Sequence, residues 1–251
     1  MSEQNPQPIP PNFYPPDPGE VLLIDKPLGW TSFDVVRKLK FGGKFQKIGH
    51  AGTLDPLATG LLICCTGKMT KQIDSYQAQE KEYTGTLVLG KTTPSVDLET
   101  PFDAVDYPTD HITPELLAQA AQRLTGAIEQ IPPIYSAIWV DGQRAYRQAR
   151  RGVAIEMKAR PVQVYAFDLD TSRFPEIDFR IVCSKGTYVR SLVRDLGEGV
   201  QSGAHMSALR RTRIGNFRVE DALTIEDFIA QRGGARRGDA KALEPDTAED
   251  F

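Results

Sequence analysis

The segment 49–60 contains the residue type and spacing best suited to chemistry in this chain. Its sequence is Gly-His-Ala-Gly-Thr-Leu-Asp-Pro-Leu-Ala-Thr-Gly, so a single acid, Asp55, lies among glycines and threonines. A carboxylate in such a segment is available for chemistry, and covalent catalysis is one use of it. The same Asp-Pro pair is also typical of an ordinary turn, because Asp bonds to its own backbone and Pro fixes φ.

The residues after Asp55 favour the functional interpretation. The run Leu-Leu-Ile-Cys-Cys at 61–65 is typical of a buried strand. A buried strand would anchor the loop rigidly, and a loop anchored in this way can aim one side chain.

The segment around Asp55 closely resembles the Gly-x-Leu-Asp-Pro-x-Ala-x-Gly motif of TruB-type pseudouridine synthases, which isomerise a uridine in the T-loop of transfer RNA. Further segments resemble the other boxes of this family, and they follow in the family's order over about residues 20–218. These segments are 25–32, 81–83, 132–137 with 142–152, 184–191 and 203–211. An ordered set of boxes is far more specific than one motif.

The resemblance assigns catalytic roles. It implies that Asp55 is the nucleophile, that Arg190 is its guanidinium partner, and that Tyr83 stacks on the target base and takes the C5 proton. Stacking is the favoured part of the Tyr83 role, because a phenol of ordinary pKa is a poor base at neutral pH. Tyr188 and Leu209 match residues that line the uracil pocket. On local sequence alone, Arg190 is a surface residue, and Tyr83, Tyr188 and Leu209 are core residues.

The carboxylate needs a nearby cation. A site dry enough to hold a flipped base raises the pKa of Asp55 by desolvation, although the nucleophile must stay ionised. A guanidinium stays charged when buried and can bind a carboxylate through two nitrogens, so Arg190 is suited to this role. Its expected place at a helix N-terminus, which already carries positive partial charge, also favours pairing with an acid.

Two further polar residues lie in or near the boxes. His50 matches a family residue that contacts RNA where the flipped base has left its stack, so the resemblance implies RNA binding. A generic loop histidine is the alternative. Asp97 matches a polar residue near the family's site, but Pro94 replaces an expected acid, and Asp97 is therefore left out of the predicted site.

Residues 131–160 resemble the RNA-gripping insertion of the family. They contain six basic and two acidic residues, with Tyr135, Trp139 and Tyr146 interleaved. Basic side chains contact phosphates and aromatic rings stack on exposed bases, which suits a folded RNA loop. A solvated helix face is the alternative. The residues predicted to bind RNA are Arg144, Arg147, Arg150 and Arg151.

The net charge of −3 is unusual for a protein that binds nucleic acid. The acids gather at the ends, with two acids and no base in residues 1–19, and nine acids and four bases in residues 219–251. Residues 20–218 therefore carry four more basic than acidic residues. Clustering of this charge matters more for RNA binding than the total does.

The composition argues against several other classes of protein. With 251 residues, 40% of them hydrophobic, the chain can bury a substantial core. No apolar run approaches the roughly 20 residues that span a bilayer, and no signal peptide pattern is present, so we expect a cytoplasmic protein. Cys64, Cys65 and Cys183 lack Cys-x-x-Cys spacing and lie in apolar segments, so we expect buried thiols rather than disulfides or zinc ligands. The histidines are too scattered to indicate a metal site.

The pattern of apolar residues predicts more strands than helices, with no regular βαβ alternation. We therefore expect an α+β fold with a mixed, mainly antiparallel central sheet flanked by helices and loops; the resemblance implies the pseudouridine synthase fold. Strands are predicted at 21–24, 61–65, 83–89, 162–169, 177–183 and within 206–219. Helices are predicted at 33–40, 68–78, 113–124, 188–196 and 224–228.

Three parts follow along the chain. Residues 1–19 contain seven of the 18 prolines and are predicted to be a disordered leader. Residues 20–218 form the catalytic domain, with the insertion at about 131–160, and residues 219–251 form a short C-terminal extension. Longer family members carry a C-terminal RNA-binding PUA domain, and 33 residues after Arg218 are too few for one. Compared with the longer family members, we therefore expect weaker binding of the acceptor stem and the same reaction.

The resemblance implies a tRNA pseudouridine synthase that acts on the T-arm, and we expect it to be a monomer. No cofactor is expected, because nothing is oxidised and nothing leaves, and no guide RNA or protein partner is expected. One alternative is a noncatalytic RNA-folding module of the same fold, which would not need Asp55, Tyr83 and Arg190 together. Another is a guide-dependent synthase of the ribonucleoprotein type, which relies on the PUA region.

Overall fold

The structure, a computed structural model, describes residues 18–232 except 137, 141 and 154, and it does not describe the side chain of Arg150. Most of the predicted leader and the end of the C-terminal extension therefore lie outside the described residues.

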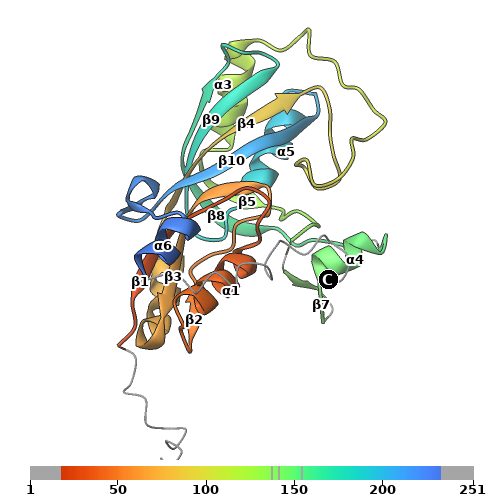
Figure 1. Cartoon of the computed structure of the whole chain (residues 1–251). Helices are drawn as coiled ribbons and strands as arrows, with labels where there is room; N and C mark the ends of the chain where they lie inside the picture. The colour runs from red at the N-terminus through yellow and green to blue at the C-terminus, as the bar shows by residue number, and fades with distance from the viewer. Residues whose placement is uncertain (1–17, 137, 141, 154, 233–251) are drawn as a thin grey trace, which may run out of the picture.

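The described residues form one large sheet with helices around it and a small hairpin that projects from it (Figure 1). The strands are β1 (Val21–Lys26), β2 (Ile48–His50), β3 (Ala58–Thr66), β4 (Lys81–Leu89), β5 (Gly126–Gln130), β6 (Trp139–Val140), β7 (Gln143–Arg144), β8 (Arg160–Asp170), β9 (Glu176–Cys183), β10 (Ala204–Ile214) and β11 (Phe217–Arg218). The helices are α1 (Ser32–Gly42), α2 (Ile73–Ala78), α3 (Pro114–Arg123), α4 (Ala145–Arg150), α5 (Val189–Gly199) and α6 (Ile225–Gln231), with 3-10 turns η1 (Gly67–Gln72) and η2 (Val219–Asp221).

The strand order in the large sheet is β1-β3-β10-β4-β9-β8-β5, with β2 paired to β3 and β11 paired to β10. The pairing of β3 with β10 is parallel, and the other pairings between these strands are antiparallel. This confirms the predicted α+β fold with a mixed, mainly antiparallel sheet. The apolar pattern does not predict β2, β5 or the β6–β7 hairpin, because segments of two to five residues are too short to show a period.

Two groups of helices anchor the sheet. Helices α3 and α5 cover the face of β8 and β10, where Leu117, Ile181 and Leu192 belong to the largest apolar cluster. Helices α1 and α6 pack against each other beside β1, around Ile24 and Phe228. The strands between these groups, β3, β10 and β4, carry most of the residues considered below.

Local sequence accounts well for α1 and poorly for the segment after β3. Thr31 caps α1: its hydroxyl accepts from the Asp34 amide, and the Asp34 carboxylate accepts from the Thr31 amide, both at 3.0 Å. This capping box satisfies two otherwise unpaired amides.

The prediction of one continuous helix at 68–78 is wrong. The segment forms the 3-10 turn η1 followed by α2, which begins only at Ile73. Neither piece has a side-chain cap or a buried residue, so nothing extends one regular helix across both.

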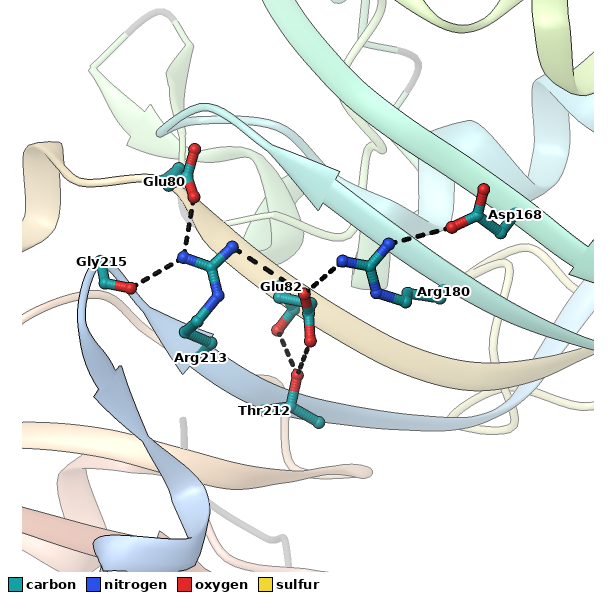
Figure 2. A network of polar contacts seen from close by, with 7 residues as sticks. All are labelled: Glu80, Glu82, Asp168, Arg180, Thr212, Arg213 and Gly215. Carbon is teal, nitrogen blue, oxygen red and sulfur yellow. Dashed lines mark hydrogen bonds and ion pairs between the residues drawn. The ribbon is translucent and has the colours of Figure 1, made fainter.

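A row of charged residues crosses β8, β9, β4 and β10 (Figure 2). It lies on the face opposite the apolar residues of β9 that belong to the α3 and α5 cluster, here called the open face of the sheet. Arg180 on β9 pairs with Glu82 on β4 at 2.7 Å and with Asp168 on β8 at 2.9 Å. Arg213 on β10 extends the row, with its guanidinium 3.8 Å from Glu82. Side chains alternate along a strand, so the outward direction of Glu82 turns its neighbour Tyr83 toward the other face.

Gly60 lets β3 approach β10 closely. Its φ is +101°, and a Cβ there would lie 2.3 Å from the Arg211 carbonyl oxygen. We expect Gly60→Ala to destabilise the fold by roughly 2–4 kcal/mol, because it adds overpacking to backbone strain. The measurement is the free energy of unfolding in denaturant. Gly126→Ala is the matched control, since its φ is +102° and no atom of the described residues lies within 4 Å of the added Cβ. An equal loss of stability in both variants would show that the close approach of β3 to β10 adds nothing to the effect of backbone strain.

Candidate active site

A cavity of about 760 Å³ opens between the Asp55 loop, β4, β10 and the start of α5. Its walls come from parts of the chain that are far apart in sequence. The residues that concern its chemistry are Asp55, Tyr83, Ser136, Tyr188, Arg190 and Leu209. The structure therefore brings together five of the predicted site residues and adds a serine from the insertion.

Hydrogen bonds from the segment 25–32 hold the Asp55 loop in place. The Leu54 amide donates to Ser32 Oγ at 2.9 Å, and this hydroxyl lies 3.2 Å from the Leu54 carbonyl oxygen. On the other side of Asp55, the carbonyl of Pro56 accepts from the Gly29 amide at 2.9 Å. The loop is therefore fixed on both sides of the acid, as the rigid-loop interpretation predicts.

Lys26 adds a buried amine beneath the same loop. It is fully buried, and its Nζ donates to the carbonyls of Pro27 at 3.0 Å and Pro56 at 3.3 Å. Burial lowers the pKa of Lys26 to about 8, while the nearby Asp55 carboxylate opposes this shift. The amine thus serves as a multiple donor that ties the two turns together.

Arg190 pairs with Asp55 inside the cavity. Its Nε lies 2.9 Å from Asp55 Oδ2, and its side chain is 4% exposed, so the surface arginine suggested by local sequence is wrong. Nη1 donates to the Ser95 carbonyl at 3.0 Å and Nη2 to the Tyr135 carbonyl at 2.8 Å. These two carbonyls fix the plane of the guanidinium. Its Nε is then in close ion contact with Asp55 Oδ2, although the Nε–H forms no hydrogen bond among the described residues.

Asp97 belongs to the same cluster, although the sequence analysis left it out. Its side chain is 3% exposed, and Oδ2 lies 3.7 Å from Arg190 Nε. The guanidinium is therefore shared between two carboxylates. In the sequence, Asp97 already matched a polar position near the family's site. It was not included in the predicted site because Pro94 replaces an acid that the family pattern has nearby.

The pKa of Asp55 is raised. Burial is the largest cause, the Arg190 guanidinium opposes it, and the charges of Asp97 and Glu99 raise the pKa further. The side chain is 35% exposed, toward the cavity that it lines, so water in the free protein still solvates part of the carboxylate. Arg190 therefore favours ionisation against an environment that disfavours it.

Tyr83, Leu209 and Tyr188 form apolar walls around the acid. Tyr83 on β4 is buried, and burial raises the pKa of its phenol, which keeps the phenol protonated at neutral pH. Leu209 on β10 is directly opposite Gly85 of β4. The backbone of Tyr188 is held by both ends of the Gln130 side-chain amide, at 2.8 and 3.1 Å.

Arg211 is a cavity residue to which the sequence analysis gave no role. It is 1% exposed and directly opposite Tyr83 in the pairing of β10 with β4. Its Nε donates to the Leu61 carbonyl at 2.8 Å and its Nη2 to the Gly52 carbonyl at 3.1 Å. It thus joins the two ends of the segment that carries Asp55, and its positive charge opposes the rise in the pKa of Tyr83.

His50 does not line this cavity. It lies on β2, paired with Cys64 of β3, and its Nδ1 is buried without a hydrogen-bond partner among the described residues. Burial and the charge of Arg211 both lower the pKa of His50, so the neutral imidazole is favoured.

The three cysteines are buried, as predicted.

The insertion presents basic and aromatic side chains together. The Arg144 guanidinium lies 5.0 Å from the centre of the Trp139 ring, and that of Arg147 lies 5.9 Å from the Tyr146 ring. Arg151 is exposed at the end of α4, and the side chain of Arg150 lies outside the described part of the chain. Figure 1 shows α4 and β7 projecting from the body of the protein. This arrangement suits contact with a partner that carries phosphates and bases.

The described residues offer neither a metal centre nor a membrane-spanning helix. Within residues 18–232, apart from the gaps, no group of three or more His, Cys, Asp or Glu side chains has the arrangement of a metal site. In the same part of the chain, no helix has the length and hydropathy needed to cross a membrane.

Comparison with known proteins places this arrangement in a family. The profile described as "TruB family pseudouridylate synthase (N terminal domain)" matches residues 38–189, and that described as "tRNA pseudouridylate synthase B C-terminal domain" matches residues 190–245. A relative named tRNA pseudouridine synthase B, from Phocaeicola vulgatus, is 56% identical over 84% of this chain and 92% of its own length. A relative of the same name from Flavobacterium johnsoniae is 53% identical over 84% of this chain and 94% of its own length.

Solved structures agree with this assignment. A chain of a Cbf5-Nop10-Gar1 complex superposes with a TM-score of 0.65 and 29% identity, over 84% of this chain and 53% of that chain. This chain thus spans about half the length of that solved chain. A chain of an archaeal box H/ACA sRNP Nop10-Cbf5 complex gives a TM-score of 0.63 and 26% identity, over 92% of this chain and 60% of that chain. The protein belongs to the TruB family of pseudouridylate synthases.

Proposed function

We propose that this protein isomerises a uridine in the T-loop of transfer RNA to pseudouridine. The observation that supports this most directly is the Asp55–Arg190 pair at 2.9 Å, in a cavity walled by Tyr83, Tyr188 and Leu209. The relatives named tRNA pseudouridine synthase B support the same substrate class.

The reaction needs a nucleophile and a place to hold the detached base. The C1′–N1 bond breaks, the base turns, a C1′–C5 bond forms, and a proton leaves C5 while N1 gains one. Asp55 divides this step by covalent catalysis. Arg190 keeps Asp55 ionised as the base excludes water from the cavity. No electron is transferred and no group is lost, so the mechanism needs no cofactor.

The walls of the cavity hold the base during this exchange. Tyr83 stacks on the uracil, because its raised pKa suits contact better than proton removal. Tyr188 and Leu209 complete the pocket. His50 contacts RNA where the base has left its stack, and its neutral imidazole is suited to filling an apolar gap.

The direct test uses the purified protein and an unmodified tRNA transcript, followed by mapping of pseudouridine. A single modified T-loop uridine, formed with no added guide RNA or protein, is the expected result, and it also tests our proposal that the enzyme acts alone. Gel filtration tests the proposed monomer, and fractionation of cells tests the proposed cytoplasmic location. Tight tRNA binding with no pseudouridine would favour the noncatalytic RNA-folding module instead.

The arginines of the insertion are expected to set the salt dependence of tRNA binding. We expect the combined change of Arg144, Arg147 and Arg151 to Gln to weaken binding and to reduce the slope of log K against log salt by about 0.7–0.9 for each phosphate that is no longer neutralised. The measurement is a titration at several salt concentrations. The double change of Arg173 and Arg180 to Gln, on the open face of the sheet, is the control and should leave the slope unchanged. A wild-type slope in the triple variant would contradict the role of the insertion.

A further inference from the structure

Ser136 places a buried hydroxyl on the cavity wall with no hydrogen-bond partner in the described part of the chain. The residue is 5% exposed. Buried polar groups in native proteins are nearly always paired, and one that is unpaired needs a reason. A ligand that enters the cavity and supplies the missing partner is such a reason.

The backbone on both sides of this hydroxyl is held in place. The Tyr146 amide of α4 donates to the Ser136 carbonyl at 3.0 Å. Arg190 donates to the carbonyl of the preceding residue, Tyr135, at 2.8 Å. The backbone that carries the hydroxyl is therefore held between the insertion and the guanidinium that pairs with Asp55.

Two half-buried hydroxyls on the cavity wall, those of Ser184 and Thr187, are already used by the protein, whereas Thr53 on the same wall is exposed. Ser184 Oγ accepts from the Gln163 amide at 3.0 Å, and Thr187 Oγ1 donates to the Ser184 carbonyl at 3.0 Å. These groups hold the turn before α5 together. Ser136 differs from them because its hydroxyl has both its donor and its acceptor capacity available.

A flipped uracil brings polar groups that need partners. Its two carbonyls accept and its N3–H donates, and all three lose water when the base enters a closed pocket. A hydroxyl can donate to either carbonyl or accept from the N–H. The rings of Tyr83 and Tyr188 and the side chain of Leu209 offer faces that stack on the base, while its polar edge needs a hydrogen-bonding group of the wall. Ser136 Oγ and Arg160 Nε are the buried polar atoms of this wall that have no partner among the described residues and are not already paired with Asp55.

We propose that Ser136 Oγ hydrogen-bonds the polar edge of the flipped uracil and is a specificity-determining residue that the insertion contributes to the active site. The inference rests on the proposed function and adds a base contact to it. The insertion then has two roles: its arginines contact the RNA backbone, and its serine recognises the base.

The first experiment compares Ser136→Ala with Ser202→Ala. Ser202 is also 5% exposed, but it does not line the cavity. We expect Ser136→Ala to lower the single-turnover rate of pseudouridine formation about 10- to 100-fold, because a buried edge of the base loses its partner. The dissociation constant of whole tRNA should change less than about 3-fold, because the arginines hold the backbone. The melting temperature should stay the same or rise, because an unpaired buried hydroxyl is removed.

Ser202→Ala should keep the wild-type rate. A wild-type rate in Ser136→Ala would overturn the proposal. So would a fall in its melting temperature that accounts for the reduced rate, because that is the result expected from a structural role alone. If Ser136→Ala does not fold, Ser136→Cys, which keeps the shape of the side chain with a somewhat larger and weaker donor, is measured in its place.

The second experiment identifies the contact on the base. RNA hairpins of the T-arm carry uridine, 2-thiouridine, 4-thiouridine or 3-deazauridine at the target position, so that each polar group on the edge is weakened in turn. We expect one of these changes to weaken binding by wild type at least about 5-fold and to have less than about a 2-fold effect on Ser136→Ala. Additive effects for all three analogues would overturn the contact.

These measurements separate the two proposals. If wild-type protein forms no pseudouridine from uridine, the proposed function fails, while equilibrium binding of the four hairpins still tests recognition of the base by Ser136. If wild type is active and the effects are additive, only the role of Ser136 fails.

Discussion

Asp55→Asn is expected to abolish pseudouridine formation, with a loss in kcat of at least about 10⁴-fold. An amide keeps the size of the side chain but removes the nucleophilic oxygen anion, and loss of a covalent nucleophile has effects of this order. The measurement is single-turnover conversion of an unmodified tRNA transcript. Binding of tRNA should stay close to wild type, because the insertion and the cavity walls are unchanged.

Asp74→Asn is the matched control for this variant. Asp74 lines the same cavity from α2, but it is exposed and takes no part in the Asp55–Arg190 cluster. Its replacement should change kcat by less than about 3-fold. Retention of activity by Asp55→Asn would exclude Asp55 as the nucleophile, whereas equal losses in both variants would show that the effect is one of charge in the cavity.

The stability of Asp55→Asn carries independent information. The folded-state pKa of Asp55 is raised above its ordinary value of 3.8, so the folded protein holds this proton more tightly than the unfolded chain does. The protonated Asp55 side chain therefore adds to the free energy of unfolding. This stabilisation is complete below the unfolded-state pKa of Asp55 and is lost as the pH rises through its folded-state pKa. At pH 7 the ionised carboxylate therefore disfavours folding, and its replacement by Asn should leave the melting temperature unchanged or raise it.

Arg190→Met is expected to be the second most damaging change, with kcat at neutral pH at least about 100-fold lower. Without the guanidinium, burial and the negative charge of Asp97 raise the pKa of Asp55 further, so less of the nucleophile is ionised. The acid limb of the pH–rate profile should therefore move to higher pH, and activity should partly recover as the pH is raised. A profile with an unchanged acid limb would contradict the electrostatic role of Arg190.

The same change should also destabilise the fold. Removing one partner of a buried ion pair typically costs about 3–5 kcal/mol, and the partial exposure of Asp55 places the expected loss at the lower end. Arg123→Met, which removes a hydrogen bond to the Gly199 carbonyl at the surface, is the control and should lose less than about 1 kcal/mol. Adding Asp55→Asn to Arg190→Met should recover part of the stability, because one of the two unpaired carboxylates is removed.

Much of the site could be predicted because its residues lie in short, ordered segments. The acid before a buried strand, the helix at 33–40 and the strand at 83–89 each follow from local pattern. The proposed catalytic pair, Asp55 and Arg190, came from the family resemblance, since local pattern alone placed Arg190 at the surface. The structure brings this pair to 2.9 Å.

Other features depend on which strands meet. Arg211 and Tyr83 are neighbours only because β10 lies beside β4, and Gly60 is required only because β3 approaches β10. Asp97 joined the site through the path of the loop after β4, although its local sequence departs from the family pattern. Strand order arises from contacts between distant segments, which a local period does not encode.

The sequence by itself determined the fold class and the starts of the capped helices, because caps and apolar periods act over a few residues, and its resemblance to a family singled out Asp55. Only the tertiary structure decided how charge is distributed around that acid. It set the sharing of one guanidinium between Asp55 and Asp97, the burial of Lys26 and Arg211, and the unpaired hydroxyl of Ser136 within the described part of the chain. The physical reason is that desolvation and ion pairing depend on what packs around a group in three dimensions, and that packing exists only once the sheet has assembled.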